Sequence, residues 1–282
     1  MTAAPRPSTV TSADGTTIAF LTVGQGDPVI LVGGRMRTAE DYLPLARSLT
    51  PRFSVHLIDR RGRGSSGPQG PDHSIARECD DVLALQASTG AVRVFGHSYG
   101  GLVALRTAAR APVFDRIAVY EPGVSVGGSI PTAWMPRYRE LLGVGDPRGA
   151  FAHFVRGSGH APGPVARLPL WYLRTVLRLV VRAPQWRRME PLLASNLAEH
   201  EEVRRLDGDL TAFAAVAAQV LLLGGSRSPQ PATVDTLQHL RAVLPSASIE
   251  LLDGLDHNAP DEHAPDVVGT RVRRFLETTP SG

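Results

Sequence analysis

Runs of apolar residues and amphipathic segments follow one another along most of the chain. Continuous runs rich in Val, Ile and Leu, such as 29–32 and 54–58, are typical of strands buried on both faces. Between them, apolar residues recur at intervals of three or four, which predicts helices. The strands predicted in this way are 17–23, 29–32, 54–58, 92–95, 116–120, 220–223 and 249–252, and the helices are 39–49, 75–87, 232–244 and 265–277.

This alternation predicts an α/β protein in which parallel β-α-β units form a doubly wound sheet. In such a sheet the functional loops follow the carboxyl ends of the strands. The chain begins differently, because alternating runs at 9–12 and 17–23 flank Asp14-Gly15, a dipeptide that favours a hairpin turn. We therefore expect an antiparallel start to a mostly parallel sheet.

Between residues 123 and 207 the alternation stops. The pattern there is mostly helical and is interrupted by proline and glycine. We interpret 126–206 as a helical cap inserted into a core formed by 1–125 and 207–282. Within the cap, the segment 168–181 has apolar residues at helical spacing, with Arg174, Arg178 and Arg182 forming a second stripe.

The strand at 92–95 leads into Gly96-His97-Ser98-Tyr99-Gly100, and an alanine-rich helical pattern follows. A G-x-S-x-G sequence between strand and helix predicts a sharp turn that exposes its serine as a nucleophile. The same turn directs the amide of Tyr99 and the amino end of the helix at an oxyanion that forms when Ser98 attacks a carbonyl. A glycine-rich structural turn is the alternative.

Four motifs resemble those of the α/β-hydrolase superfamily. They are Gly33-Gly34-Arg35, Asp59-Arg60-Arg61-Gly62-Arg63-Gly64-Ser65, Gly96-His97-Ser98-Tyr99-Gly100 and Gly254-Leu255-Asp256-His257, each after a predicted strand. The resemblance implies an eight-stranded, mostly parallel sheet. Within the superfamily the chain is similar to capped serine enzymes such as carboxylesterases, proline iminopeptidases and cofactor-free haloperoxidases.

The resemblance also implies roles for single residues. The histidine of the family follows the last strand, where His257 stands, and we expect it to be the base for Ser98. The second oxyanion donor is expected to be the amide of Arg35, beside Gly34, which lets the backbone approach the substrate. Relatives usually have His-Gly where this chain has Gly33-Gly34.

Serine enzymes of this family use a third catalytic residue, an acid that orients the histidine. The position of this acid departs from the family pattern in this chain. Relatives usually place an aspartate after the strand that corresponds to 220–223, whereas this chain has Ser228 there. We expect Glu121, after the strand 116–120, to replace it, with Pro122 favouring an extended backbone at Glu121. An ion pair between Glu121 and a cap arginine is the alternative. On this hypothesis the substitution Ser228→Ala has almost no effect.

The amino-acid composition excludes several kinds of cofactor, metal site and partner. All thirty basic residues are arginine, which excludes a lysine Schiff base and a Walker lysine. The nine histidines have no metal-ligand spacing, so we expect neither a metal nor a cofactor. One cysteine, no signal-like segment and no membrane-length apolar run lead us to expect a soluble cytoplasmic protein without a membrane span. The near-neutral net charge of +3 argues against nucleic acid as a partner.

The cap is strongly basic, with twelve arginines against six acidic residues in 126–206. A solvated basic face is one explanation, and an anionic partner such as an acyl carrier or a coenzyme A thioester is another. Trp134 and Trp171 are candidates to line an acyl pocket.

We expect a serine hydrolase that cleaves an ester, lactone or thioester of a small or medium apolar acyl compound. The alternatives are a protein of the same fold that acts as a lyase, a cyclase or a ligand binder, and a cofactor-free perhydrolase.

Overall fold

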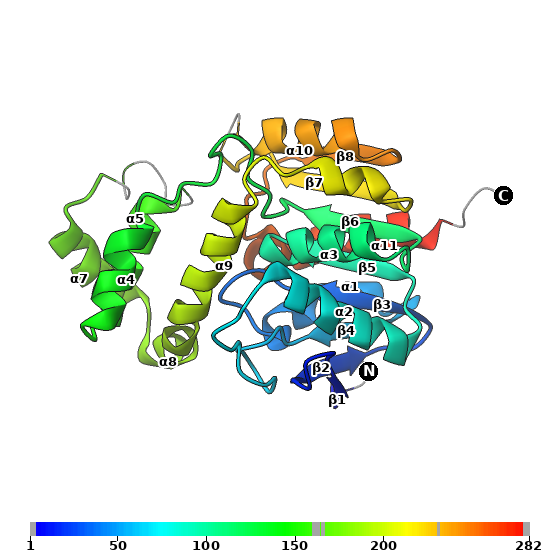
Figure 1. Cartoon of the computed structure of the whole chain (residues 1–282), viewed down its shortest axis with the longest axis horizontal. Helices are drawn as coiled ribbons and strands as arrows, with labels where there is room; N and C mark the ends of the chain where they lie inside the picture. The colour runs from blue at the N-terminus through cyan, green and yellow to red at the C-terminus, as the bar shows by residue number, and fades with distance from the viewer. Residues whose placement is uncertain (1–3, 160–163, 165–166, 230–231, 279–282) are drawn as a thin grey trace. The chain divides into compact units, whose positions relative to one another are not determined.

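A computed structural model describes residues 4–159, 164, 167–229 and 232–278. The chain forms two compact units (Figure 1), one made of Met1–Gly123 and Asp209–Gly282 and the other of Val124–Gly208. We call the first the core unit and the second the cap unit. The segment 126–206, predicted to be an inserted cap, lies within the cap unit.

The core unit contains an eight-stranded sheet in the order β1-β2-β4-β3-β5-β6-β7-β8. The first two pairings, β1 with β2 and β2 with β4, are antiparallel, and all the others are parallel. This confirms the predicted doubly wound, mostly parallel sheet with an antiparallel start. The strands are β1 (Arg6–Thr11), β2 (Thr17–Val23), β3 (Asp27–Val32), β4 (Phe53–Ile58), β5 (Arg93–His97), β6 (Arg116–Tyr120), β7 (Gln219–Gly225) and β8 (Ala247–Leu252).

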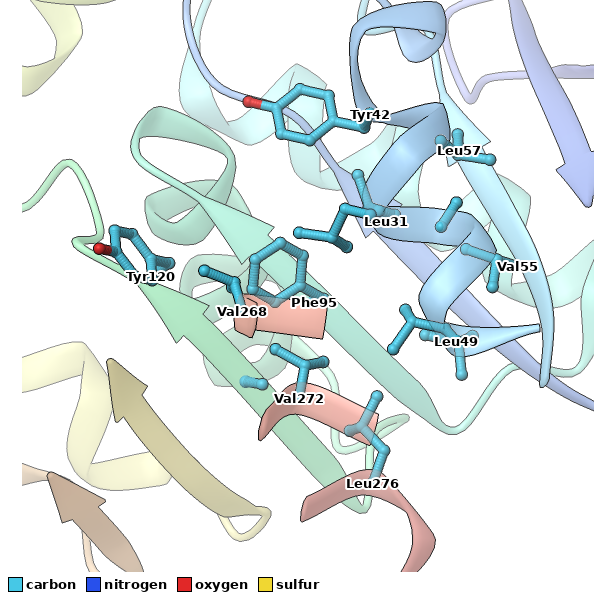
Figure 2. Close-up of a cluster of buried hydrophobic side chains, with 14 of the residues drawn as sticks. Leu31, Tyr42, Leu49, Val55, Leu57, Phe95, Tyr120, Val268, Val272 and Leu276 are labelled. Atoms are coloured by element: carbon cyan, nitrogen blue, oxygen red, sulfur yellow. The ribbon is translucent and has the colours of Figure 1, made fainter. Parts of the chain in front are cut away.

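One face of the sheet is covered by α1 (Leu43–Leu49) and α11 (Pro265–Glu277), which lie against each other. Figure 2 shows Leu31 and Phe95 of the central strands packed with Leu49 of α1 and with Val272 and Leu276 of α11. Burying apolar side chains of this size is worth about 1.5–3 kcal/mol each. The continuous apolar runs of the central strands are explained by burial on both faces.

The other face carries α2 (Ile75–Thr89) and α3 (Tyr99–Arg110), which pack together (Figure 1). The helix α2 begins at Ser74, whose hydroxyl accepts a hydrogen bond from the Arg77 amide, and ends at Gly90 in the left-handed conformation. The remaining long helix of the core unit is α10 (Ala232–Val243). Because the parallel strands share one direction, their carboxyl ends bring the loops after β3, β5, β6, β7 and β8 to one edge.

The cap unit consists of helices that pack around aromatic rings. The ring of Trp134 lies edge-on to those of Tyr138, Phe154 and His200, with centroids 5.0, 5.0 and 4.7 Å away. Its indole N–H donates a hydrogen bond to the carbonyl of Pro131. The helices of the cap unit include α4 (Met135–Gly143), α5 (Pro147–Gly157), α7 (Leu170–Val180), α8 (Ala183–Met189) and α9 (Leu193–Arg205).

The helix predicted over 168–181 is shorter in the structure, and its arginine stripe is divided. The helix α7 covers Leu170–Val180, and Arg182 is the residue before α8, in extended conformation. Pro184, in the first turn of α8, starts a new helix there instead of continuing the old one. Arg174 bonds to Asp146, so only Arg178 of the three arginines is an exposed residue of α7 without a carboxylate partner among the described residues.

Candidate active site

The turn between β5 and α3 has the geometry that its glycines require. A Cβ on Gly100 would lie 2.2 Å from the carbonyl oxygen of Val32, and one on Gly96 would lie 2.6 Å from that of Gly100. Only glycine fits at either place, which explains the motif. Ser98 itself has φ 53° and ψ −123° and is the residue before α3. Its side chain therefore leaves a strained turn at the carboxyl edge of the sheet. The exposure predicted from the motif is not found, because Ser98 is only 3% exposed, with the loops after β3 and β8 beside it.

His257 lies in the loop that follows β8. Its Nε2 atom is 3.1 Å from the hydroxyl oxygen of Ser98, and its Nδ1 atom is 2.7 Å from Oε2 of Glu121. The imidazole thus bridges a hydroxyl and a carboxylate that are far apart in the sequence. The order nucleophile, base and acid in this hydrogen-bonded chain is the one that activates a serine.

Glu121 follows β6 and uses its second oxygen to bind the loop after β7. Its Oε1 atom accepts hydrogen bonds from the amide of Gly225 at 2.8 Å and from the hydroxyl of Ser228 at 2.5 Å. Burial raises the pKa of this carboxyl group, but the hydrogen bonds with His257, Ser228 and Gly225 outweigh it and hold the pKa below its usual value. The carboxylate is therefore ionised at neutral pH.

The backbone at Glu121 differs from the extended conformation predicted from Pro122. Glu121 has φ 41°, in the left-handed region. Its amide donates to the carbonyl of Leu223, and the amide of Gly123 donates to the carbonyl of Ser98. These two bonds turn the chain sharply after β6, and the tertiary contacts overcome the local preference that Pro122 imposes.

Positive φ values mark three places around this site. Among the described residues, the non-glycine residues with positive φ are Met36, Ser98 and Glu121. Each one costs roughly 1–3 kcal/mol and persists only where the surroundings impose it. Met36 follows Arg35 in the loop after β3, and the other two are the serine and the carboxylate that contact His257. Backbone strain is therefore concentrated in the loops after β3, β5 and β6.

The two amides predicted to bind an oxyanion belong to the first residue of α3 and to the loop after β3. Tyr99 is the first residue of α3, so its N–H is at the amino end of that helix. Gly34 and Arg35 belong to the loop after β3, and a Cβ on Gly34 would lie only 3.3 Å from Cβ of Ser98. This loop therefore passes directly beside the serine, and a side chain at Gly34 would crowd it.

His97 forms a polar bridge beneath the site that the sequence did not reveal. Its Nδ1 atom is 2.6 Å from the hydroxyl of Tyr42, and its Nε2 atom is 2.9 Å from the carbonyl of His257. Burial lowers the pKa of His97 far below its usual value, so the ring is neutral. It donates from Nε2 and accepts from the Tyr42 hydroxyl at Nδ1.

The two tryptophans predicted to line a pocket lie in the cap unit. Trp134 is buried in the aromatic cluster described above, whereas Trp171 is 72% exposed on α7. No group of three or more His, Cys, Asp or Glu residues that could hold a metal ion occurs within the described ranges. None of the helices in those ranges is both long and apolar enough to cross a membrane.

The fold and the loops at its carboxyl edge agree with a comparison against known families. The chain belongs to the α/β hydrolase family, whose sequence model matches residues 29–270. This confirms the family to which the four sequence motifs pointed.

The chain is also similar to individual proteins over nearly its whole length. The chain is 28% identical over 272 residues to a pimeloyl-[acyl-carrier protein] methyl ester esterase of Xanthomonas campestris pv. campestris, covering 92% of this chain and 98% of that protein. It is also similar to the crystal structure of an α/β hydrolase from Sphaerobacter thermophilus, with a TM-score of 0.79, 31% identity and coverage of 95% and 100%. The enol-lactonase of Burkholderia xenovorans shares the fold, with a TM-score of 0.70, 22% identity and coverage of 96% and 100%. The named esterase supports hydrolysis of an ester as the reaction class, and the enol-lactonase shows the fold alone.

Proposed function

We propose that the protein is a serine hydrolase that cleaves the ester, lactone or thioester bond of a small or medium apolar acyl compound through an acyl-enzyme. The observation that carries this proposal is the chain of contacts from Ser98 through His257 to Glu121, with distances of 3.1 and 2.7 Å. Membership of the family and the similarity to a named esterase support the same reaction class.

In the first half of the reaction, Nε2 of His257 takes the proton of Ser98 as the serine oxygen attacks the acyl carbon. The negative charge that develops on the carbonyl oxygen is stabilised by the amides of Tyr99 and Arg35. Glu121 stays ionised, keeps Nδ1 of His257 protonated and stabilises the imidazolium. His257 then gives its proton to the leaving alcohol or thiol.

In the second half, a water molecule attacks the acyl group on Ser98, and His257 acts as base again. The same two amides stabilise the second tetrahedral intermediate. When this intermediate collapses, the bond between the acyl carbon and the serine oxygen breaks, His257 returns the proton to that oxygen, and the acid is released. No step requires a cofactor.

The alternative of a protein that binds without hydrolysing rests on the lack of an aspartate at position 228. In the structure, Ser228 donates to Glu121, and Glu121 is in contact with His257. The loop after β7 thus stabilises a carboxylate that comes from the neighbouring strand. This arrangement favours hydrolysis over binding alone.

For the substrate, we propose an apolar acyl ester, and the relative named for a carrier-bound methyl ester suggests an acyl carrier as partner. The basic composition of the cap is compatible with an acidic carrier. The test is hydrolysis of p-nitrophenyl butyrate and of one acyl methyl ester in free and carrier-bound form. We expect turnover by the wild type and its loss in Ser98→Ala. Turnover that survives Ser98→Ala would disprove the proposed nucleophile.

A further inference from the structure

Two consecutive peptide units of the loop after β3 are held from the side of the protein interior. The carbonyl of Gly33 accepts a hydrogen bond from Nε of Arg60 at 3.0 Å, and the carbonyl of Gly34 accepts one from Nη2 of Arg60 at 3.0 Å. The amide of Gly34 donates to the hydroxyl of Tyr42 at 2.8 Å. The carbonyl of Gly34 also accepts a longer hydrogen bond from Nη1 of Arg63, at 3.3 Å. Two guanidinium groups and one phenol therefore hold this loop, and Arg60 is the one that binds both carbonyls.

The orientation matters because the carbonyl of Gly34 and the amide of Arg35 belong to the same peptide unit. In a planar trans peptide the C=O and N–H bonds point in opposite directions. Arg60 makes the shorter of the two hydrogen bonds to this carbonyl, so it also helps to hold the direction of the Arg35 N–H. That amide is the second donor in the mechanism proposed above, and the loop passes within contact distance of Ser98.

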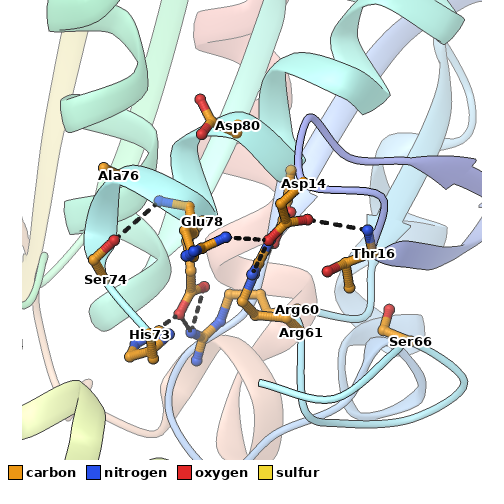
Figure 3. A network of polar contacts seen from close by, with 12 residues as sticks. Asp14, Thr16, Arg60, Arg61, Ser66, His73, Ser74, Ala76, Glu78 and Asp80 are labelled. Atoms are coloured by element: carbon orange, nitrogen blue, oxygen red, sulfur yellow. Dashed lines mark hydrogen bonds and ion pairs between the residues drawn. The ribbon is translucent and has the colours of Figure 1, made fainter. Parts of the chain in front are cut away.

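Arg60 is itself held rigidly. Its Nη1 atom binds both oxygens of Glu78 on α2, at 2.9 and 2.8 Å, and the two side chains are only 2% and 1% exposed (Figure 3). The guanidinium also lies over the ring of Tyr99, 4.8 Å from its centroid. Burying two charges is costly, and such pairs often contribute little to stability. A role in fixing the loop gives this pair a function beyond stability.

We propose that Arg60, held by Glu78, is a positioning residue that aims the Arg35 amide at the oxyanion. The inference rests on the proposed function and extends it to a residue behind the site. A hydrogen bond from a cation to the Gly34 carbonyl also polarises the peptide unit, which strengthens the Arg35 N–H as a donor. The contribution is larger in the transition state, where the oxygen carries charge, than in the bound substrate.

The chain offers a matched control in the next residue. Arg61 binds Asp81 of α2 with Nε and Nη2, at 2.8 and 2.6 Å, and the side chains are 1% and 2% exposed. Its other partner is Asp14 in the turn between β1 and β2, which Figure 3 shows beside Arg61. This pair matches Arg60–Glu78 in burial and charge, but within the described part of the chain the partners of Arg61 are Asp81 and Asp14 and not the loop 33–35. The change in kcat when the Arg61–Asp81 pair is removed therefore measures the effect of losing a buried ion pair alone.

The experiment compares Arg60→Met/Glu78→Leu with Arg61→Met/Asp81→Leu, since removing both charges leaves no lone buried ion. We measure kcat and KM for p-nitrophenyl butyrate and the inhibition constant of an alkyl trifluoromethyl ketone, whose adduct with Ser98 carries an oxyanion. We expect the first variant to lose about 10- to 100-fold in kcat with KM unchanged within about threefold. Binding of the ketone weakens by a similar factor, and the control variant stays within about threefold for both.

Arg60→Lys is the second variant, because it keeps the charge but lacks the geometry needed to bind two carbonyls and a carboxylate at once. We expect its kcat to lie between that of the wild type and that of the Arg60→Met/Glu78→Leu variant. Equal losses in the Arg60 and Arg61 variants, or a loss in KM without kcat, would overturn the inference while leaving the proposed function intact. A folded wild type that neither hydrolyses the ester nor binds the ketone would overturn both.

Discussion

Glu121 is hydrogen-bonded to two segments of the core unit: the loop of His257, and the end of β7 with its following loop, which supplies Gly225 and Ser228. Replacing its carboxylate with an amide keeps the shape but removes the charge that stabilises the imidazolium. We predict that Glu121→Gln lowers kcat by about 10²- to 10⁴-fold. Steady-state kinetics with p-nitrophenyl butyrate measure this, and thermal unfolding serves as the control for folding. A loss of less than fivefold in a folded variant would show that another group orients His257.

Ser228 requires a changed prediction. From the sequence we expected Ser228→Ala to be almost silent, but its hydroxyl donates a short hydrogen bond to Glu121. A hydrogen bond to a charged group is worth about 1.5–3 kcal/mol. We therefore predict that Ser228→Ala lowers kcat by about 3- to 30-fold and moves the acidic limb of the pH profile upward, because the Glu121 pKa rises. A variant with the wild-type pH profile would contradict this assignment.

Ser228→Asp provides a second test of the same contact. Beside Glu121 it creates two carboxylates within hydrogen-bonding distance, which repel each other and raise one pKa. We expect Ser228→Asp to impair the wild type but to restore part of the activity of Glu121→Gln, where it supplies the missing charge. If the double variant is no more active than Glu121→Gln, His257 is not reached from the loop after β7.

His97 gives the core unit a pH-dependent stability. Its pKa is far below its usual value in the folded state because of burial, whereas in the unfolded chain it takes up a proton near pH 6.5. Below that pH the unfolded state binds the extra proton, so stability falls as pH decreases towards the folded pKa. We predict a slope from this residue that rises as the pH falls below 6.5 and approaches at most about 1.4 kcal/mol per pH unit.

The measurement is urea unfolding of wild type and His97→Asn at pH 7, 6 and 5. Only the difference between the two slopes is assigned to His97, because the other titrating groups occur in both proteins. Asp261, for example, has its pKa raised to about 6 by burial and acts in the opposite direction. Equal slopes in the two proteins would contradict the prediction.

At the scale of elements, the strands and the nucleophile turn were predictable because their signals are local. Continuous apolar runs identify β3, β5 and β7, and the glycines of G-x-S-x-G report a close backbone approach that only they permit. The acid was harder to assign, since Glu121 and His257 are 136 residues apart and nothing local indicates their contact. The contacts that Arg60 and His97 make with the loops of the site were missed for the same reason.

The prediction that Arg182 continues the stripe of Arg174 and Arg178 was wrong, because helical spacing alone does not reveal where one helix stops and the next begins. Pro184 starts α8 and separates Arg182 from the stripe of Arg174 and Arg178. Arg174 binds Asp146, the N-cap of α5, and so joins two helices within the cap unit. The three arginines therefore have different roles, which the sequence pattern had grouped together.

This difference gives a prediction for the partner of the cap unit. If exposed arginines attract an acyl carrier, Arg178→Gln/Arg182→Gln raises KM for a carrier-bound ester by about three- to tenfold at low salt. The effect shrinks near 0.15 M salt, where the Debye length is about 8 Å. KM for p-nitrophenyl butyrate stays within about twofold.

Arg174→Gln is the control for folding of the cap unit. Its ion pair with Asp146 is partly exposed, so we expect at most about 1 kcal/mol of lost stability and no selective effect on the carrier-bound ester. Equal effects of all variants on both substrates would show that the arginines support folding only. No effect in any variant would leave the arginines as a solvated face.

At the scale of the whole molecule, every group assigned to the proposed chemistry belongs to the core unit. The loops after β3, β5, β6, β7 and β8 supply these groups, and the sheet holds the loops in place. The cap unit has a net positive charge, with twelve arginines against seven acidic residues in 124–208, and contains an aromatic cluster. Bond cleavage is thus assigned to the core unit, and the choice of acyl partner is where we expect the cap unit to act.

The central claim is that Ser98 is a nucleophile activated by His257, and labelling with a fluorophosphonate probe tests it most directly. The probe reacts with an activated serine, and peptide mapping by mass spectrometry identifies the modified residue. We predict stoichiometric labelling of the peptide that contains Ser98 in the wild type. Labelling should disappear in Ser98→Ala and become at least about 100-fold slower in His257→Ala. A folded wild type that stays unlabelled, or that is labelled at another serine, would contradict the account.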